Sequence, residues 1–367
     1  MNILVIGRAF PEEKTGMMGI FELEQATALN NLGHEVKYFF CDTRSIKYLR
    51  KYGYKYIIKN GVAAYGYHLP IGGAPQKVFD RIKKHYYEKG LQKVLVKEWM
   101  PDIIHVHFPL LTLNDYIWDL LKGFEKPIVV TEHWSKVQTR ELSSRYLNLL
   151  NRIVNEADEF ICVGDALKES VIELTKTVRD IRIVPNMVSS LFNYQNEQNT
   201  KKKHFEFITV GRLIEIKRFD WVIEAFVKAF PNNMDVHLKI VGDGPLFSRL
   251  KRKIDDLNMN ERIIMTGFLS REETANLMKK SDAFVSASAL ETFGVPFIEA
   301  MACGKPVVGA KGGSIDKYIN ETNGILFESD NLNDLVRALK QVYANRNLYD
   351  SKLIAETATK YFSEEAI

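Results

Sequence analysis

Residues 282–313 read DAFVSASALETFGVPFIEAMACGKPVVGAKGG and hold two carboxylates, Glu291 and Glu299, eight residues apart. An apolar, strand-like run opens the stretch, Pro296 stands where a helix takes its first residue, and Gly304 stands where that helix is expected to stop. The pattern predicts Glu291 in the loop after a strand and Glu299 about one turn into a short helix. Both then lie at the carboxyl end of a sheet, where open α/β folds bind ligands. This spacing suits a sugar nucleotide better than a metal ion, and a helix N-terminus there attracts anions.

The same alternation of apolar strands and amphipathic helices runs through the whole chain. The first half opens with a strand, a helix over residues 19–32 stopped by Gly33, and a second strand, which together make a βαβ unit. A polar stretch, residues 193–203, precedes a second alternating series. The pattern predicts an α/β protein of two doubly wound domains in tandem, each with a parallel sheet covered on both faces. The predicted strands are 3–6, 34–40, 103–107, 128–131, 160–163 and 181–184, then 205–210, 236–241, 262–266, 283–286, 307–308 and 324–327.

Length and composition agree with two domains. At 367 residues the chain is too long for one ordinary α/β domain, and 46% hydrophobic and 26% charged residues are typical of a globular protein. We expect a first domain over residues 1–188, a linker over 189–203, a second domain over 204–367, and a cleft between the domains. No apolar run approaches the roughly 20 residues that span a bilayer. The opening MNILVI resembles a buried strand rather than a signal peptide, so we expect a soluble, cytoplasmic protein.

Residues 44–97 concentrate the positive charge. Thirteen Lys and Arg face two carboxylates, Asp80 and Glu88, so this segment carries +11 while the whole chain carries +4. Tyrosines are interleaved with the charges, and residues 77–99 have the mixed basic and apolar character of an interfacial helix. An anionic membrane surface is one partner that fits; a solvated helix face beside a core stripe is the other interpretation. Nucleic acid is not expected, because no recognition module accompanies the charge.

Two cations follow the first strand of the second half. The stretch GRLIEIKR places Arg212 and Lys217 at the carboxyl end of that strand, before a helix predicted over residues 219–230. An arginine fork and a lysine point charge can converge on one phosphate group. Ordinary loop charges are the alternative, and the position at a strand end favours a phosphate site. Neither half has G-x-G-x-x-G after its first strand, which argues against a nicotinamide dinucleotide.

Glycine-containing turns stand at other element ends. Gly242 opens a GDGP turn after one strand, and TGFL, residues 266–269, follows the next strand. Gly16 and Gly19 precede the first helix and could point backbone N–H groups at a phosphate. Small residues let a ligand approach backbone amides, but such turns also occur for purely geometric reasons. Each turn is a weak signal by itself.

Histidines gather near two strand ends. His105 and His107 alternate along a predicted strand and so share a face, and His133 follows another strand in TEHW. These three histidines could be imagined in a metal site, but no other feature supports one. His133 is better interpreted as a residue that contacts the ligand, because loops at strand ends collect such contacts. The three cysteines lie in or beside apolar segments without paired spacing, so neither a disulfide nor a zinc site is expected.

The second half resembles the retaining GT-B glycosyltransferases of family 4, which include bacterial lipopolysaccharide, capsule and phosphatidylinositol mannosyltransferases. The resemblance rests on GRLIEIKRFD, IVGDGPL, TGFLS, ALETFGVPFIEAMACGKPVV, the Gly312-Gly313 pair and NGILF, in that order. In the first half TGMMGIFELEQATALNNLGHEV, PDIIHVHF and VVTEHW are similar to such enzymes, and FFCDTRSIKYLRKYG and PIGG resemble enzymes of extracellular polysaccharide assembly. The resemblance implies two Rossmann-like domains facing each other across a cleft, with the acceptor on the N-terminal side and the donor on the C-terminal side.

The implied activity is transfer of a hexosyl or N-acetylhexosaminyl group with retention and without a metal or other cofactor. The donor would be a nucleotide-diphosphate sugar, with a mild preference for UDP. The acceptor would be a hydroxyl of a glycan or lipid-linked molecule in cell-surface polysaccharide or capsule assembly. The protein would be cytoplasmic, with peripheral contact to the inner face of an anionic membrane through residues 44–97.

The resemblance also implies catalytic roles. Arg212 and Lys217 would hold the diphosphate and stabilise the charge that develops as it leaves. Glu291 would contact hydroxyls of the donor sugar, and His133 would lie near the transferred group. A leaving phosphate oxygen would take the proton of the acceptor hydroxyl attacking on the same face. A covalent intermediate on Glu291 stays open, although hydrogen bonds to sugar hydroxyls argue against it.

The donor-binding residues follow in the same way. Glu299 would bind the vicinal ribose hydroxyls, which fits a carboxylate that accepts two hydrogen bonds. Phe268 and Leu269 would border the base. The full predicted donor-binding set is Glu299, Gly16, Gly19, Gly211, Gly242, Phe268, Leu269, Phe293, Gly294 and Val295.

Two alternatives stay open. A non-hydrolysing sugar-nucleotide epimerase shares the two-domain architecture, and a catalytically silent sugar-nucleotide sensor or partner subunit would share the binding residues. The E-x7-E and GR-x4-K arrangements favour transfer, and the presence of all four charged residues argues against a silent protein. Family members usually end in a helix that crosses back to the N-terminal domain. This chain stops at YFSEEAI, where that helix would begin, so we expect the closing element to be short or missing.

Overall fold

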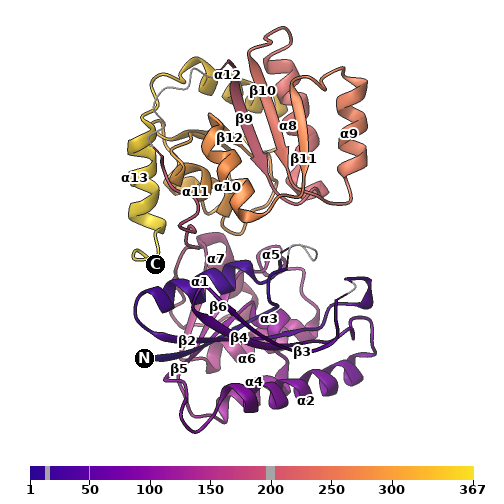
Figure 1. Ribbon diagram of the computed structural model, residues 1–367, viewed down its shortest axis with the longest axis vertical. Coiled ribbons are helices and arrows are strands. Elements are labelled where there is room, and N and C mark those ends of the chain that lie inside the picture. Colours follow the sequence, from indigo (N-terminus) through magenta and orange to yellow (C-terminus); the bar gives the residue numbers. More distant parts are fainter. Residues whose placement is uncertain (13–16, 49, 196–202) are drawn as a thin grey trace. The chain divides into compact units, whose positions relative to one another are not determined.

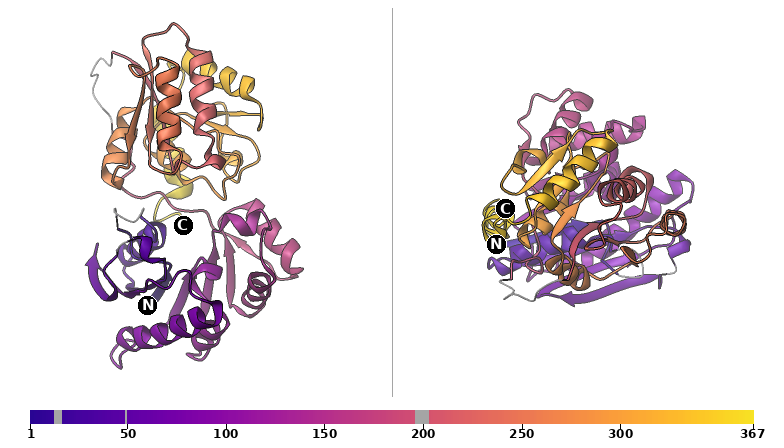
Figure 2. Two further views of the ribbon diagram at one scale, coloured as in Figure 1. Left: turned by 90° about the vertical axis from the view of Figure 1, so that its right-hand side faces the viewer. Right: turned by 90° about the horizontal axis from the view of Figure 1, so that it is seen from above.

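The computed structural model describes residues 1–12, 17–48, 50–195 and 203–367. It divides into two compact units, Met1–Pro185 and Asn186–Ile367. In each unit, helices lie on both sides of a parallel or largely parallel sheet (Figures 1 and 2). The predicted α/β fold of two doubly wound domains is therefore confirmed, and the predicted cleft between them stays a prediction. None of the described helices is long and apolar enough to cross a membrane.

The first unit contains an eight-stranded sheet in the order β3-β4-β2-β1-β5-β6-β7-β8. Its strands pair in parallel except for β3 and β4, which form an antiparallel hairpin at one edge. The strands are β1 Asn2–Gly7, β2 Glu35–Asp42, β3 Gly53–Lys59, β4 Val62–His68, β5 Ile103–His107, β6 Ile128–Glu132, β7 Glu159–Cys162 and β8 Arg182–Ile183. The helices are α1 Ile20–Asn31, the 3-10 turn η2 Ile46–Tyr48, α2 Gln76–Val94, α3 Pro109–Thr112, α4 Asp115–Lys122, α5 Ser135–Gln138, α6 Ser144–Glu156 and α7 Asp165–Thr175.

The β3–β4 hairpin was not predicted. Along β3, the side chains of Tyr54, Tyr56 and Ile58 are exposed, while the alternate positions 53, 55 and 57 are half-buried. The strand therefore lacks the continuous apolar run that identified the central strands, because an edge strand buries only part of one face. The helix expected in the basic segment covers Gln76–Val94, and Tyr87, Leu91 and Val94 form its buried stripe.

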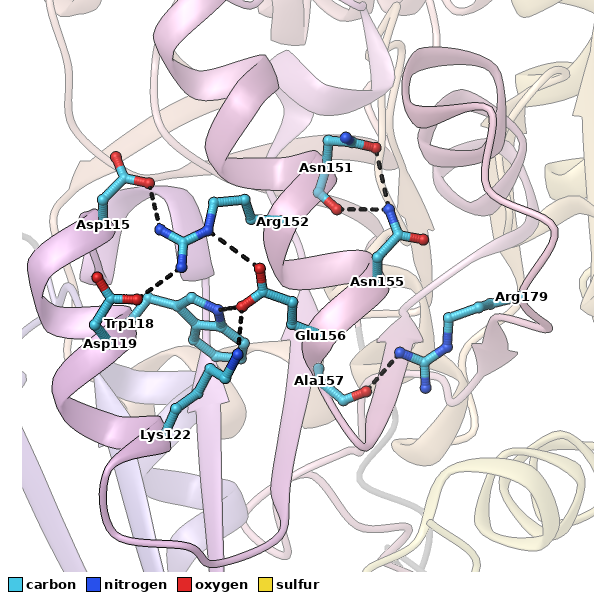
Figure 3. A network of polar contacts seen from close by, with 10 residues as sticks. All are labelled: Asp115, Trp118, Asp119, Lys122, Asn151, Arg152, Asn155, Glu156, Ala157 and Arg179. Carbon is cyan, nitrogen blue, oxygen red and sulfur yellow. Dashed lines mark hydrogen bonds and ion pairs between the residues drawn. The ribbon is translucent and has the colours of Figure 1, made fainter.

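A polar network ties α4 to α6 on the surface of the first unit. Arg152 of α6 donates from Nη1 to Asp115 at 2.9 Å, from Nη2 to Asp119 at 2.7 Å and from Nε to Glu156 at 3.2 Å (Figure 3). One guanidinium thereby connects two acidic side chains of α4 with its own helix. The fork geometry of arginine suits this bridging role.

The second unit contains a six-stranded, wholly parallel sheet in the order β11-β10-β9-β12-β13-β14. Its strands are β9 Phe205–Val210, β10 Val236–Val241, β11 Ile263–Gly267, β12 Ala283–Val285, β13 Val307–Ala310 and β14 Gly324–Phe327. Its helices are η3 Glu215–Lys217, α8 Phe219–Ala229, α9 Phe247–Asp256, α10 Arg271–Lys280, α11 Val295–Ala302, η4 Asp316–Tyr318, α12 Leu332–Ala344 and α13 Ser351–Phe362. The winding direction reverses between β9 and β12, and doubly wound sheets bind ligands at the carboxyl ends of such strands.

Strand β12 shows how both faces of this sheet are buried. Ala283 and Val285 belong to the cluster that includes buried residues of α8, α9 and α12. Phe284 points to the other face, where its ring lies 5.0 Å from that of Phe297 in α11 at 74°. Each fully buried side chain of this size contributes about 2–3 kcal/mol. This packing fixes the start of α11, which carries part of the predicted site.

The described start of the predicted linker belongs to the second unit and packs against it. Within the predicted linker, residues 189–203, Phe192 is buried and the Arg271 guanidinium lies 4.7 Å from its ring centroid. The Val188 N–H donates to the carbonyl of Phe362 in α13 at 2.8 Å. Residues 196–202 of the predicted linker lie outside the described residues. The first domain was predicted to end at residue 188, and the first compact unit ends three residues earlier, at Pro185.

Candidate active site

Two loops meet at the reversal point of the second sheet. Lys217 closes the loop after β9, Glu291 lies in the loop after β12, and Lys217 Nζ lies 2.6 Å from Glu291 Oε1. The Ala289 N–H also donates to the Ile216 carbonyl at 2.9 Å. β9 and β12 are neighbours in the sheet, although 72 residues, 211–282, lie between the end of β9 and the start of β12. The structure thus brings together a cation and a carboxylate that the sequence assigned to separate motifs.

Arg212 lies on the same loop as Lys217. Its side chain is exposed, and among the described residues it makes no side-chain hydrogen bond or ion pair. The backbone of the loop is held instead, because the Leu213 N–H donates to Asp243 O and the Leu246 N–H donates to Leu213 O. A fixed backbone with a free guanidinium leaves Arg212 able to meet a ligand anion. Convergence of Arg212 and Lys217 on one phosphate stays a prediction.

The glycines after β9 and β10 let two turns pack directly on each other. Gly242 has φ 138°, and a Cβ there would lie 1.9 Å from the Gly211 carbonyl oxygen. Gly244 has φ 159°, and a Cβ there would lie 2.5 Å from the Leu213 carbonyl oxygen. Rotating a side chain could relieve neither steric clash, because both oxygens are backbone atoms. These glycines therefore have a packing role, and their contact with a donor stays a prediction.

Glu299 lies on α11 as predicted, and it has a buried partner that the sequence analysis did not identify. Arg271 Nη1 lies 2.5 Å from Glu299 Oε1, and the Glu299 side chain is only 3% exposed. Arg271 is the first residue of α10, after a capping box formed by Ser270 and Glu273. The available signal was an arginine directly after the TGFLS turn, at the carboxyl end of β11. Arg271 offsets the burial of the Glu299 carboxylate and fixes its direction.

The N-terminus of α11 and the nearby turns shape a recess. Gly294 caps the helix with φ 100°, while Phe293 and Val295 on either side of it are buried. The recess is small and open to solvent, and it is lined by Ser286, Ser288, Glu291, Phe297, Lys311 and Gly313, among others. Phe268 is 41% exposed after β11, and Leu269 beside it is half-buried. The N–H groups of Gly312 and Gly313 are already bound to Asp316, at 2.7 and 3.2 Å.

In the first unit, the three predicted histidines form a buried stack at the ends of β5 and β6. His107 Nδ1 lies 3.1 Å from His133 Nε2, and His105 Nε2 lies 2.8 Å from the Thr131 hydroxyl. The rings of His133 and Phe108 stack with centroids 4.5 Å apart. Burial lowers the pKa of His105 to about 4 and the pKa of His107 well below its usual 6.5. His105 and His107 are thus neutral at pH 7, and one nitrogen of each of His107 and His133 is used in their mutual contact.

Arg8 joins this group from the end of β1. Its guanidinium carbon lies 3.3 Å from the centroid of the Phe108 ring, and its Nε donates to the fully buried Glu22 at 2.7 Å. β1 and β5 are the strands between which the first sheet reverses its winding. Phe108 itself has a left-handed backbone, with φ 50°. The sequence analysis missed Arg8 because a single arginine after a strand carries no motif.

Glu132, directly before His133, is a further residue that the sequence analysis missed. Its side chain is fully buried, and its Oε1 accepts hydrogen bonds at 2.8 Å from the N–H groups of His133 and Trp134. Burial raises the pKa of Glu132 to about 7, although these two N–H groups and Arg8 act in the opposite direction. Glu132 therefore holds the backbone that presents His133.

Gly19 is required where α1 begins. It caps the helix with φ 94°, and a Cβ there would lie 1.9 Å from the Ala9 carbonyl oxygen. The Tyr38 hydroxyl donates to the same oxygen at 2.8 Å. A side chain at residue 19 would displace this contact. Gly16, the other predicted donor-binding glycine of this turn, lies outside the described residues.

Two parallel-sheet units in tandem are the architecture of the GT-B class of glycosyltransferases, and comparisons with solved structures agree with this fold. The whole chain aligns with 96% of sucrose-phosphate synthase from Thermosynechococcus elongatus at 20% identity and a TM-score of 0.76. It aligns equally with 96% of Anabaena HepE, solved in complex with UDP and glucose, at 18% identity and a TM-score of 0.71. At these identities the likeness shows the fold alone.

Two family descriptions cover most of the sequence. Residues 192–359 match Glycosyl transferases group 1, and residues 19–190 match Glycosyltransferase Family 4. The chain belongs to the family-4 glycosyltransferases of the GT-B fold. It is 26% identical over 279 residues to N-acetyl-alpha-D-glucosaminyl L-malate synthase of Bacillus anthracis, with 72% of each chain covered. It is 28% identical over 218 residues to the GPI3 subunit of a yeast (Saccharomyces cerevisiae) phosphatidylinositol N-acetylglucosaminyltransferase, with 57% of this chain but only 48% of that protein covered.

Proposed function

We propose that this glycosyltransferase moves a sugar from a UDP-sugar, with retention of anomeric configuration, to a hydroxyl of a glycan or lipid-linked acceptor in cell-surface polysaccharide assembly. The observation that carries the proposal is the contact between Lys217 and Glu291 at the reversal point of the second sheet, with Arg212 on the same loop. Cations there would hold the donor diphosphate. The carboxylates, Glu291 and Glu299, would hold the hydroxyls of the sugar and the ribose.

We propose the following reaction for these residues. The bond between the anomeric carbon and the diphosphate oxygen breaks, and charge grows on that oxygen as the sugar becomes cation-like. Lys217 and Arg212 would stabilise this charge, which is the kind of preorganised electrostatic effect that dominates many enzymes. The acceptor hydroxyl forms the new bond on the same face, and its proton passes to the departing phosphate oxygen. His133 would contact the transferred sugar, and no metal ion is needed in this scheme.

The names of relatives support the choice of donor. The Bacillus anthracis enzyme, the yeast subunit and a 2-deoxystreptamine N-acetyl-D-glucosaminyltransferase of Streptomyces fradiae are all named for N-acetylglucosaminyl groups. Anabaena HepE was solved with UDP-glucose. We therefore place UDP-N-acetylglucosamine and UDP-glucose first among the donors to be tested.

A donor screen tests the proposal. UDP- and GDP-sugars are added singly to the full chain, with and without EDTA, and the rise in melting temperature is measured, since a ligand that binds only the folded state stabilises it. The expected result is a rise with one UDP-sugar that EDTA does not remove. Transfer from that donor to an acceptor should then give a product whose anomeric configuration, measured by NMR, matches the donor. An inverted product, or a rise that requires a divalent metal, would contradict this scheme.

Assays with the same protein and donor distinguish a transferase from an epimerase and from a silent binding protein. An epimerase would interconvert the sugar nucleotide with no acceptor present, and NMR of the donor alone would detect the second sugar. A silent binding protein would bind the donor and release no UDP with any acceptor. Release of UDP that depends on an acceptor, without a second sugar nucleotide, is the outcome expected for a transferase.

We also propose that the basic segment contacts an anionic membrane that carries the acceptor. Lys77, Val78 and Lys89 are exposed on α2, and the Lys93 ammonium lies 4.7 Å from the ring centroid of Tyr54 on β3. Cationic and aromatic side chains together suit a lipid headgroup region. The double variant Lys77→Gln/Lys89→Gln should sediment less with phosphatidylserine vesicles than the wild type at low salt. Lys251→Gln/Arg252→Gln, which removes two exposed cations of α9, is the matched control. Equal binding to uncharged vesicles would contradict the proposal.

A further inference from the structure

The ends of β2 and β4 carry a second cluster of charged side chains, separate from the histidine stack. Asp42 ends β2, His68 ends β4, and the two are partners in the parallel register. Arg44 Nη2 lies 2.7 Å from Asp42 Oδ2, Arg44 Nε lies 3.0 Å from Asp42 Oδ1, and Arg50 also forms an ion pair with Asp42. Two guanidinium groups therefore share one buried carboxylate.

The cluster holds buried polar atoms that lack hydrogen bonds. The Arg50 side chain is 4% exposed, and its Nε has no hydrogen-bond partner in the described part of the chain. His68 is 2% exposed, and neither of its ring nitrogens has one either. Glu12 Oε1 lies 3.9 Å from His68 Nε2, which is too far for a hydrogen bond. Buried polar atoms of this kind are rare in native proteins, and a ligand group is one reason for them.

Among the described residues, the charges around the cluster leave a positive excess of one, from three cations and two carboxylates. Arg44, Arg50 and Lys55 are the cations that act on Asp42 or His68, and Asp42 and Glu12 are the carboxylates. Burial lowers the pKa of His68, so its ring is neutral at pH 7 and can donate one hydrogen bond. A bound carboxylate or phosphate would bring the total charge to balance or slightly beyond it. It would also give Arg50 and His68 an acceptor.

The position of the cluster indicates which ligand it would meet. The sheet order β4-β2-β1-β5-β6 puts β2 three strand spacings from β6, which is about 14 Å at roughly 4.8 Å per spacing. His133 follows β6, and the transferred sugar is proposed to lie beside it. The donor diphosphate is assigned to Arg212 and Lys217 in the other unit. An anion at β2 and β4 would therefore belong to the acceptor, at some distance from the hydroxyl that attacks.

We propose that Arg44, Arg50 and His68 form a subsite for an anionic group, carboxylate or phosphate, of the acceptor. This inference rests on the proposed function, since it assumes that the first unit holds the acceptor. Asp42 would hold both guanidinium groups in place, and Arg50 Nε would donate to the anion beside the positive charge of Arg44. His68 would donate the remaining hydrogen bond. The subsite would select acidic or phosphorylated acceptors over neutral glycans.

Three sugars that differ only at C6 test the subsite. Glucose 6-phosphate, glucuronate and glucose are titrated into the full chain at matched ionic strength, and binding is followed by ligand-observed NMR. We expect one of the two charged sugars to bind at least tenfold more tightly than glucose. Preference for glucose 6-phosphate would indicate a phosphorylated acceptor, and preference for glucuronate would indicate an acidic sugar. Equal binding of all three would overturn the proposal.

Two variants separate binding from a structural role. His68→Phe loses no hydrogen bond within the described residues, so a purely structural role predicts little change. The subsite predicts that this variant loses most of the preference, and that Arg50→Gln loses it fully. Arg152→Gln, which removes a surface guanidinium of the same unit, is the control. Unchanged preference in both His68→Phe and Arg50→Gln would overturn the proposal. The rise in melting temperature caused by the UDP-sugar is measured in parallel for the wild type and both variants. No rise in the wild type would count against the proposed function rather than against the subsite.

Discussion

Lys217 Nζ and Glu291 Oε1 lie 2.6 Å apart, although 74 positions separate the two residues in the sequence. The contact forms because β9 and β12 are neighbours where the second sheet reverses direction. Their side chains are 26% and 17% exposed, so the pair is partly accessible from solvent. The pair fixes the direction of the Lys217 ammonium, which is what its proposed electrostatic role needs.

Removing the charge of Glu291 should therefore impair transfer. Glu291→Gln keeps the shape of the side chain but loses the ion pair that orients Lys217, and it weakens the proposed contact with the donor sugar. We expect kcat/KM for the donor to fall about 10- to 100-fold. Glu206→Gln is a matched control, because Glu206 pairs with Lys239 at 2.8 Å and is also 17% exposed, near the amino end of β9. Equal losses in the two variants would show that the effect is structural.

Arg271 should stabilise the fold through Glu299. Arg271→Ala leaves a carboxylate that is 3% exposed without this partner, and we expect the free energy of unfolding to fall by about 2 kcal/mol. Fully buried pairs cost more, and Arg271 is partly exposed. The double variant Arg271→Ala/Glu299→Gln should recover part of the loss, since no buried charge remains. Urea denaturation measures both. A double variant as unstable as the sum of the two single variants would exclude the coupling.

Glu132 should make stability depend on pH. Its pKa is about 7 in the folded protein and near 4.5 in a solvated chain. A raised folded-state pKa means that the stabilising contribution of Glu132 is fully present below about pH 4.5 and is lost as the pH rises through about 7. Glu132→Gln stays uncharged and keeps the acceptor for His133 and Trp134. The unfolding free energy of the variant minus that of the wild type should rise by on the order of 3 kcal/mol between pH 4.5 and pH 8. A difference in unfolding free energy that does not change with pH would contradict this.

Glu156 should have the opposite pH dependence. Its burial alone would raise its pKa, but hydrogen bonds from Lys122, Trp118 and Arg152 outweigh burial and lower the pKa to about 2 (Figure 3). The stabilising contribution is present above about pH 4.5 and is lost as the pH falls through about 2. Because Glu156 and its charged partners lie at the surface, Glu156→Gln should lower the unfolding free energy by only about 1 kcal/mol at pH 7. The two proteins should converge in stability toward pH 2, and a gap that persists there would be evidence against the network.

Much of the fold could be predicted from sequence because the central strands are buried on both faces. The central strands Ile103–His107, Phe205–Val210 and Val236–Val241 were predicted with their observed bounds, and so was the edge strand Gly324–Phe327. Strand β3 was missed because its exposed tyrosines and lysines hide the alternation of an edge strand. Pro296 and Gly304 predicted the two ends of α11, because each residue has a backbone preference that fits one end of a helix.

The candidate site was predictable only where a motif carries it. Glu291 and Glu299 stand where the spacing placed them, in a loop after a strand and on a short helix. Arg271 and Arg8 were missed because each acts through a partner distant in sequence, Glu299 and Glu22 respectively. Gly242 looked like a ligand-binding turn, and the structure also gives it a packing reason against Gly211. Contacts of this kind follow from strand order, which a single sequence does not display.

The turnover of Lys217→Ala and Arg212→Ala with a UDP-sugar and its acceptor tests most directly whether these cations stabilise the departing diphosphate. Lys239→Ala is the control, because Lys239 also pairs with a glutamate and its side chain is 24% exposed, against 26% for Lys217. We expect kcat to fall about 100-fold or more in each of the first two variants and to stay close to the wild-type value in the control. Near-normal turnover in both Lys217→Ala and Arg212→Ala would contradict the assignment.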